Sequence, residues 1–538
     1  MATNRQDSDS LESTDSTGET ADRVPAGERD DGTVTRRAAM ALAGVTGAGL
    51  LGGAVGQVGA TSNPRPRRWE QDVDAQGHTL SDLGALEMAG SEPITDFAGE
   101  DLSIEDGVLS IAGDSDLVNN VRYVDVTEGA TAVQEAVDDA DAEGHNKVVV
   151  YGDEGEWNRT VHLPSEFTLE ILDGVTITST MDASDAETFE VGDGTTAAAL
   201  ITNADHENGN DNVVVRGGHV DFSGASTGGA VWAPVWLHDC EDSLFDSIRV
   251  ENASGRGGVM FSDCRNSMMI DCTARNIGYD GIALTLDCRG CDVVRCKASE
   301  CGGPGIQAAT FGRGAGAPRG ITFTNCRTDE MIAVHGYEVA GGARNIAIQG
   351  CTARRLGIIG EVRDFRISDC DVDAVALSAL DETIRNGRID SVTMGERVVD
   401  PFSQAATILW AWEGLIENVS FSNCTAHTDG HIERFVETRL LSEEATARYV
   451  DYTNCAFDSD GAEVSQFVQH TPDGEAGYQE SVGELSNVRI QNCKIWNVDY
   501  AIEGAVDGLR VRGTELHEVG DLHDGDVTDL ETHQNDWW

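Results

Sequence analysis

Four titratable side chains in the middle of the chain could perform general acid–base chemistry: Asp280, His335, Glu338 and Glu361. Asp280 lies 8 residues after Cys272 (280 − 272 = 8), and His335 lies 9 after Cys326 (335 − 326 = 9). Two carboxyl groups about 6.5 to 9.5 Å apart can act as acid and base on a glycosidic bond. A histidine with a pKa near 6.5 can accept a proton. We therefore expect Asp280 and Glu338 to form an acid–base pair, with His335 and Glu361 beside them.

A second set of side chains is suited to holding a sugar. Flat indole faces stack on sugar rings, and Trp410 and Trp412 fall on one side of a strand of period two. Packing of these indoles in the core is the alternative. The candidate binding residues are Trp232, Trp236, Gln307, Arg313, Trp410 and Trp412.

A repeat in the chain would position these residues. Cys240, Cys264 and Cys288 lie 24 residues apart. A frame of alternating apolar residues, a turn residue (mostly Asn or Asp) and Cys recurs at Cys272, Cys326, Cys351, Cys370, Cys424, Cys455 and Cys493. A repeat of this length with short β-type runs predicts a solenoid of about a dozen coils. Alternation on both sides of the cysteine predicts that its side chain points into the coil.

This frame resembles the right-handed parallel β-helix of the pectate lyase and polygalacturonase superfamily over about residues 121–515. The resemblance implies an all-β fold with a ladder of Asn and Asp residues at one turn. It also implies a ligand along one sheet face, formed by segments 234–239, 257–263, 280–286, 304–311, 334–339 and 357–362. The segment from Asn276 to Ile282 is similar to a strand of polygalacturonase-like enzymes. The paired Asp-Asp and Gly-His-Gly motifs of those enzymes are absent, so the catalytic assignment rests on fold analogy.

The charge of the chain restricts its partners. It has 94 acidic and 37 basic residues, a net charge of −57. Such a surface disfavours nucleic acids and anionic membranes as partners. Because the lysine-poor, acidic chain is nevertheless regularly patterned, it resembles proteins of halophilic archaea.

Four segments are predicted. Residues 1–60 form a Tat export signal, because Arg36 and Arg37 precede an uncharged, glycine-rich run; a transmembrane helix is the alternative. Residues 61–120 form a linker or a small β stalk. Residues 121–520 form the β-helix, which opens with a capping helix whose capping box starts at Thr131 and which ends at Gly144. Residues 521–538 form an acidic C-terminal tail.

The 13 cysteines are mainly expected to be buried thiols. A Cys291–Cys301 disulfide and a zinc site that includes Cys288 and Cys296 are the alternatives. No metal ligand is assigned, although Ca²⁺ is an open cofactor because a Ca²⁺-dependent lyase needs clustered carboxylates.

The sequence thus predicts an exported β-helix, extracellular or at the cell surface, with no membrane span in the mature chain. It would bind and cleave an acidic polysaccharide, as a lyase or a hydrolase. A non-catalytic adhesion or tailspike-like protein and a uronan epimerase are the alternatives. The predicted oligomeric state is a monomer or a trimer.

Overall fold

The computed structural model describes residues 102–105, 108–111 and 121–537, except for internal gaps at 183–185, 192–194, 226–230, 256, 311–315, 337–340, 396–404, 428–433, 459–465, 471–482, 525–526 and 534. The predicted export signal lies outside these residues. Within the predicted linker, β1 (Leu102–Glu105) and β2 (Val108–Ile111) form an antiparallel hairpin. None of the helices in the described part of the chain is long and apolar enough to span a membrane.

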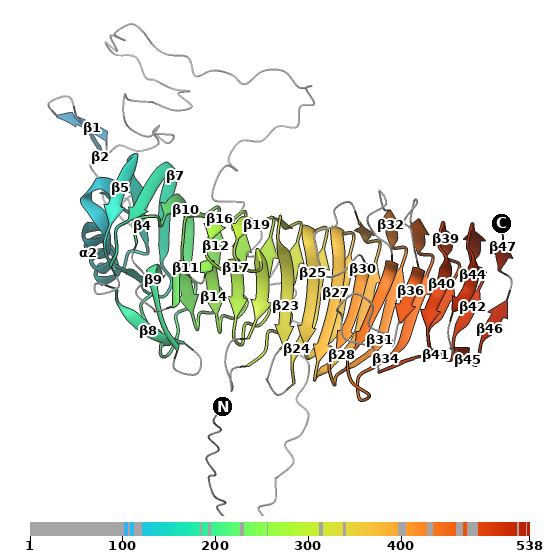
Figure 1. Cartoon of the computed structure of the whole chain (residues 1–538). Coiled ribbons are helices and arrows are strands. Elements are labelled where there is room, and N and C mark those ends of the chain that lie inside the picture. The colour runs from blue at the N-terminus through green and yellow to red at the C-terminus, as the bar shows by residue number, and fades with distance from the viewer. Residues whose placement is uncertain are drawn as a thin grey trace, which may run out of the picture. The chain divides into compact units, whose positions relative to one another are not determined.

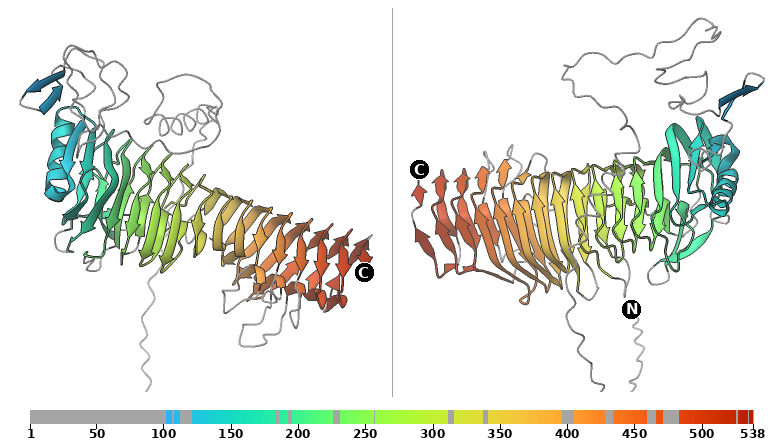
Figure 2. Two further views of the ribbon diagram at one scale, coloured as in Figure 1. Left: turned by 90° about the horizontal axis from the view of Figure 1, so that it is seen from above. Right: turned by 180° about the vertical axis from the view of Figure 1, so that it is seen from behind.

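From Val121 onward the chain winds into a stack of coils (Figures 1 and 2). Strands of one coil pair in parallel with those of the next, which produces three long sheets that we call A, B and C. The chain is therefore a right-handed parallel β-helix, as the sequence predicted. Buried apolar residues from all three sheets form one continuous core along the stack.

Sheet A contains β3 (Val121–Asp125), β4 (Lys147–Tyr151), the first parts of β7 (Thr168–Ser179) and β10 (Val214–Asp221), β12 (Leu244–Asp246), β15 (Met268–Ile270), β18 (Asp292–Val294), β21 (Thr322–Thr324), β24 (Ala343–Gln349), β26 (Val362–Ser368), β28 (Thr383–Asp390), β31 (Leu415–Ser422), β34 (Thr446–Thr453), β37 (Glu484–Ser486), β38 (Arg489–Gln491), β41 (Val506–Asp507), β42 (Arg510–Arg512), β45 (Val527–Thr528) and β46 (Glu531–His533).

Sheet B contains β5 (Glu154–Trp157), the last parts of β7 and β10, β13 (Arg249–Glu251), β16 (Thr273–Ile277), β19 (Lys297–Cys301), β22 (Arg327–Thr328), the first parts of β25 (Thr352–Gly360) and β27 (Asp371–Leu380), β29 (Thr393–Met394), β32 (Thr425–His427), β35 (Ala456–Asp458), β39 (Lys494–Trp496), β43 (Glu515–His517) and β47 (Asp536–Trp537).

Sheet C contains β6 (Val161–Leu163), β9 (Thr195–Asn203), β11 (Val231–His238), β14 (Gly257–Ser262), β17 (Asp280–Thr285), β20 (Ile306–Ala309), β23 (Met331–Gly336), the last parts of β25 and β27, β30 (Ala405–Ala411), β33 (Arg434–Leu440), β36 (Gln466–His470), β40 (Tyr500–Gly504) and β44 (Asp521–Asp524). The short strand β8 (Thr188–Val191) pairs antiparallel with β9.

The corner between sheets A and B holds the predicted ladder of Asn and Asp residues. Its members have left-handed backbone angles, for example φ 55° at Asn423 and at Asn454, which Asn and Asp tolerate better than most residues. The Asn454 amide donates to Asn423 Oδ1 (3.3 Å), and the Asn423 amide donates to Asp390 Oδ1 (2.9 Å). The ladder is confirmed on these coils.

The cysteines after this corner point into the core, as predicted. All 13 are buried, free thiols, so the Cys291–Cys301 disulfide does not form. Several thiols contact a carbonyl oxygen of the preceding coil, such as Cys326 Sγ and Val293 O at 3.3 Å. Burial raises the pKa of Cys264 and Cys288 well above the ordinary value.

Helix α2 (Gly129–Ala142) lies at the N-terminal end of the stack (Figure 1). It buries Ala130, Val133, Val137 and Ala140 in the core, which closes the end of the solenoid as predicted. The predicted N-cap, Thr131, lies three residues after the observed N-cap, Glu128. The capping box is formed by Asp125 and Glu128 of the preceding 3-10 turn η1 (Val126–Glu128), not by Thr131.

The C-terminal segment is the second correction. The described residues of the predicted tail do not form one, because β44, β45, β46 and β47 pair in parallel with β40, β41, β42 and β43 of the coil before. The last residues therefore form a further coil of the solenoid.

Candidate functional site

The predicted ligand-binding surface is the outer face of sheet C. Along the first coils this face is buried. Strands β11, β14, β17, β20 and β23 pair in order, so the predicted segments do share one sheet. One column of this sheet contains the buried residues Trp236, Met260, Ala283, Gln307 and Ala333. Phe189 of β8 belongs to the same apolar cluster as Trp236 and Met260.

The predicted position of His335 beside Asp280 is wrong. His335 is in register with Ala309, and Ala309 is in register with Thr285. Asp280 precedes Thr285 by five residues at the other end of β17, which corresponds to roughly 16 Å along a strand. Asp280 is also fully buried, and it falls on the same side of β17 as the core residues Ile282 and Leu284.

The remaining predicted catalytic residues are not assembled into a site either. Glu338 lies outside the described residues, as does Arg313 of the predicted binding set. Glu361 is half-buried and forms an ion pair with Arg363. His335 is half-buried, and burial lowers its pKa to about 4, so it is neutral at pH 7.

The tryptophans divide into two groups. Trp232 and Trp236 are 0% and 2% exposed, so they are core residues and present no face to a ligand. Gln307 is also buried, which removes it from the binding set. In contrast, Trp410 and Trp412 are 36% and 46% exposed, as an outer binding surface requires.

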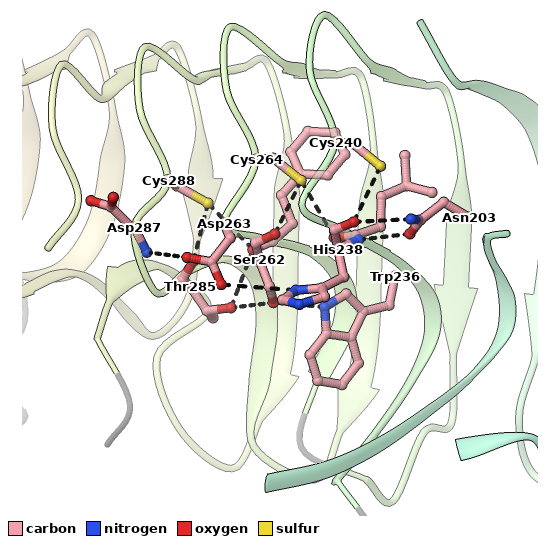
Figure 3. A network of polar contacts seen from close by, with 12 residues as sticks. Asn203, Trp236, His238, Cys240, Ser262, Asp263, Cys264, Thr285, Asp287 and Cys288 are labelled. Carbon is pink, nitrogen blue, oxygen red and sulfur yellow. Dashed lines mark hydrogen bonds and ion pairs between the residues drawn. The ribbon is translucent and has the colours of Figure 1, made fainter. Parts of the chain in front are cut away.

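A polar network that the sequence did not reveal lies on the outer side of β11, β14 and β17 (Figure 3). Trp236 Nε1 donates to Ser262 Oγ (2.7 Å), which shares a hydrogen bond with Thr285 Oγ1 (2.6 Å). His238 Nδ1 lies 3.9 Å from Asp263 Oδ2, and Asp263 Oδ1 accepts from the Asp287 amide at 3.0 Å. The residues come from adjacent coils, and only the register reveals that they meet.

The titratable pair in this network favours its neutral forms. Burial lowers the pKa of His238, against the attraction of Asp263 and Asp239. Burial also raises the pKa of Asp263. Such a pair can hold and pass one proton, but the His238 side chain is only 9% exposed. The Asn203 side chain accepts a hydrogen bond from the His238 backbone N–H (2.8 Å) and donates one to the His238 carbonyl oxygen (2.9 Å). We therefore assign the network a role in joining coils.

The open part of sheet C lies further along the solenoid. There Trp410 is in register with Arg439, and Glu437 is in register with Gln469. Buried Glu437 accepts from Arg439 Nε (2.5 Å), and Gln469 Nε2 donates to Glu503 Oε2 (3.0 Å). We call Trp410, Trp412, Arg439 and Gln469 the tryptophan platform. It combines exposed indoles with polar groups held in fixed positions.

Within the described residues, no group of three or more His, Cys, Asp or Glu side chains is arranged to hold a metal ion. The Ca²⁺ that the sequence left open therefore has no assigned ligands in this part of the chain.

Comparisons with known proteins agree with the fold. The family described as a right-handed beta helix region matches residues 191–355. No curated protein matches the chain in sequence.

Solved structures with similar folds have little sequence identity to the chain. The N-terminal fragment of gene product 12 of bacteriophage Phi29 has 15% identity and a TM-score of 0.51, over 72% of this chain and 69% of that one. The tailspike protein of E. coli bacteriophage HK620 has 13% identity and a TM-score of 0.46, over 79% and 80%. The A-module of the mannuronan C-5 epimerase AlgE6 from Azotobacter vinelandii has 12% identity and a TM-score of 0.40, over 76% and 96%. Such likenesses show the fold alone.

Proposed function

We propose that this protein binds an extracellular polysaccharide, with the tryptophan platform as the main contact for the sugar rings. The observation that carries the proposal is the exposure of Trp410 and Trp412 in a chain that buries Trp157, Trp232 and Trp236 completely or nearly so. Leaving two large apolar rings in water forgoes burial that would stabilise the fold. A ligand that stacks on them recovers that contribution.

The polar members of the platform suit a sugar as well. Arg439 is in register with Trp410, Gln469 lies one coil further on, and Glu437 and Glu503 fix these two side chains by hydrogen bonds. Ligand sites combine apolar contact area with a few positioned polar groups in this way. The proposed place of binding is outside the cell, because residues 1–60 resemble a Tat signal.

We assign no cleavage reaction to the platform. Asp280 is buried, and the register separates it from His335. Among the predicted alternatives, the described residues therefore support a binding role, such as adhesion, more directly than a hydrolase, a lyase or an epimerase.

The test compares two sets of tryptophan variants on a panel of neutral and acidic polysaccharides in molar salt. The double variant Trp410→Ala, Trp412→Ala should bind at least about tenfold more weakly than the parent, at an unchanged melting temperature. Trp496→Ala is the matched control, because Trp496 is a partly exposed indole on sheet B. A parent that binds no polysaccharide, or equal losses in both variants, would contradict the proposal.

A further inference from the structure

Six arginines occupy one position on six successive coils, at the corner where sheet C leads into sheet A. Each is in parallel register with the next, through isolated bridges at first and then through β24, β26 and β28. We call this column the arginine ladder. Its members are Arg265, Arg289, Arg319, Arg344, Arg363 and Arg385. Adjacent coils are about 4.8 Å apart, so the ladder is a continuous line of positive charge.

Such a line is unexpected in this chain. Basic residues number 37 against 94 acidic ones, so a carboxylate could easily stand between any two arginines. Like charges directly opposite each other on neighbouring strands are destabilising. The ladder therefore lowers stability along six coils unless an anion lies against it.

The carboxylates near the ladder neutralise only part of it. Arg289 pairs with Asp287, and Arg363 pairs with Glu361. Arg344 Nε donates to the Gly341 carbonyl oxygen (2.6 Å).

The other three arginines retain donor capacity. Within the described residues, Arg265, Arg319 and Arg385 have no side-chain hydrogen bond or ion pair. The Nε atoms of Arg319 and Arg385 are moreover buried without an acceptor. A buried donor without an acceptor costs about 1–3 kcal/mol in general. These guanidinium groups can therefore donate further hydrogen bonds to the acceptor atoms of a ligand.

The backbone corner beside the ladder is almost free of acids. The residues that follow the six arginines have left-handed backbone angles, and only Asp364 among them is charged. That carboxylate accepts a hydrogen bond from the Asn386 amide (2.9 Å). An anion that approaches the ladder from this side meets mainly Asn and Gly.

A second row of arginines lies on the other side of the same corner. Arg366 and Arg388 are in register on sheet A, three residues after Arg363 and Arg385. Further along, the corner deepens into a hollow of about 330 Å³ whose lining includes Asp451 as well as Arg489 and Arg510, and Arg489 forms an ion pair with Asp451. The ladder position itself is taken by Glu417 on the coil after Arg385, so the line of positive charge ends there.

We propose that the arginine ladder binds an extended, unbranched polyanionic polysaccharide, with the carboxylates of successive sugars on successive guanidinium groups. This inference rests on the proposed function and names its ligand class. Arginine presents a planar fork of donors that matches a carboxylate in two parallel hydrogen bonds. Guanidinium groups that are evenly spaced in one line match a single polysaccharide chain that carries one charge per sugar.

A nucleic acid fits the ladder less well. Duplex DNA carries one charge per about 1.7 Å of axis, and its second strand would meet the surrounding acidic surface. Single strands are bound mainly by stacking on aromatic side chains, and no aromatic residue occurs among the six ladder positions.

The test removes the three unpaired arginines. The variant Arg265→Gln, Arg319→Gln, Arg385→Gln is compared with a control of equal charge change, Arg275→Gln, Arg295→Gln, Arg327→Gln, whose residues lie on or near sheet B. Calorimetric titration in molar salt uses polygalacturonate, the same polymer fully methyl-esterified, and single-stranded DNA. Polygalacturonate should bind the ladder variant more than about tenfold more weakly, because three charge-assisted hydrogen-bonding groups are lost. The control should bind like the parent.

Two further readouts separate binding from folding. Removing unpaired like charges should leave the melting temperature of the ladder variant equal or higher. A variant with Lys at the same three positions keeps the charge but loses the planar guanidinium donors. Its affinity for polygalacturonate should fall between those of the parent and the Gln variant.

Several results would overturn the inference. Equal weakening of the control, or equal binding of the esterified polymer, would refute the ladder while leaving the proposed function intact. Tighter binding of DNA than of polygalacturonate would assign the ladder to nucleic acid. A parent that binds no polysaccharide at all would refute both proposals.

Discussion

At the scale of single residues, several partly or fully buried histidines make stability dependent on pH. Burial lowers the pKa of His206, His335 and His470 to about 4. His470 is also held in the core by a 2.6 Å hydrogen bond between its Nδ1 and Thr438 Oγ1. Its folded pKa lies below its unfolded value of about 6.5. The unfolded chain therefore binds the extra proton first, and stability falls as the pH drops below 6.5.

His470→Gln should reduce this pH dependence. The wild-type unfolding free energy should decrease between pH 6.5 and 4, and the variant should lose the contribution of one proton, at most about 3 kcal/mol over that window. Urea unfolding at several pH values in constant salt measures both slopes. Identical slopes would mean that His470 has the same pKa in the folded and unfolded chains.

The separation of Asp280 from His335, which the sequence placed side by side, shows where residue-level prediction ends. Both were located by counting from a core cysteine, yet β17 begins 8 residues after Cys272 and β23 begins 5 after Cys326 (331 − 326 = 5). The turn between sheets B and C varies in length from coil to coil. Residues at equal distances in sequence from the cysteine therefore lie at different points of sheet C. Which side chains meet depends on the strand register, and the repeat does not predict that register.

At the scale of elements, the regular corners were predictable and the irregular ones were not. The Asn and Asp ladder was visible because each residue precedes a core cysteine. The arginine ladder has no such uniform marker, because Arg265 and Arg289 follow a cysteine whereas Arg363 follows Val362. The last coil was missed because β46, with the sequence Glu-Thr-His, lacks the alternating apolar residues of the frame.

The corner conformation can be tested at Asn423, whose φ is 55°. Asn423→Ala removes the side-chain hydrogen bonds to Asp390 and Asn454 and places a Cβ in the left-handed region. We expect a loss of about 1–2 kcal/mol in unfolding free energy. Asn423→Gly is the matched control, because it loses the same hydrogen bonds but tolerates the angle. An Ala variant as stable as the Gly variant would show that backbone strain is not the reason for Asn at this corner.

At the scale of the whole molecule, charge and architecture act against each other. A net charge of −57 favours expansion, whereas the coils need close stacking along the whole solenoid. At about 0.01 M salt the Debye length is about 30 Å, which spans several coils, and at 1 M it is about 3 Å, less than one coil spacing. Concentrated salt thus confines repulsion to immediate neighbours, which is the physical basis for our proposal, made from composition, that the protein is adapted to high salt.

The melting temperature should therefore rise continuously from millimolar to molar NaCl, with scanning calorimetry as the measurement. Sucrose at matched water activity is the control, because it is excluded from the protein surface but screens no charge.

The affinity of the arginine ladder for a polyanion should also rise with salt. Salt screens the repulsion from the whole surface more than it weakens hydrogen-bonded contacts between guanidinium and carboxylate groups. A melting temperature that is independent of salt would mean that the acidic surface does not limit stability, and the salt dependence expected for the ladder would then lose its physical basis.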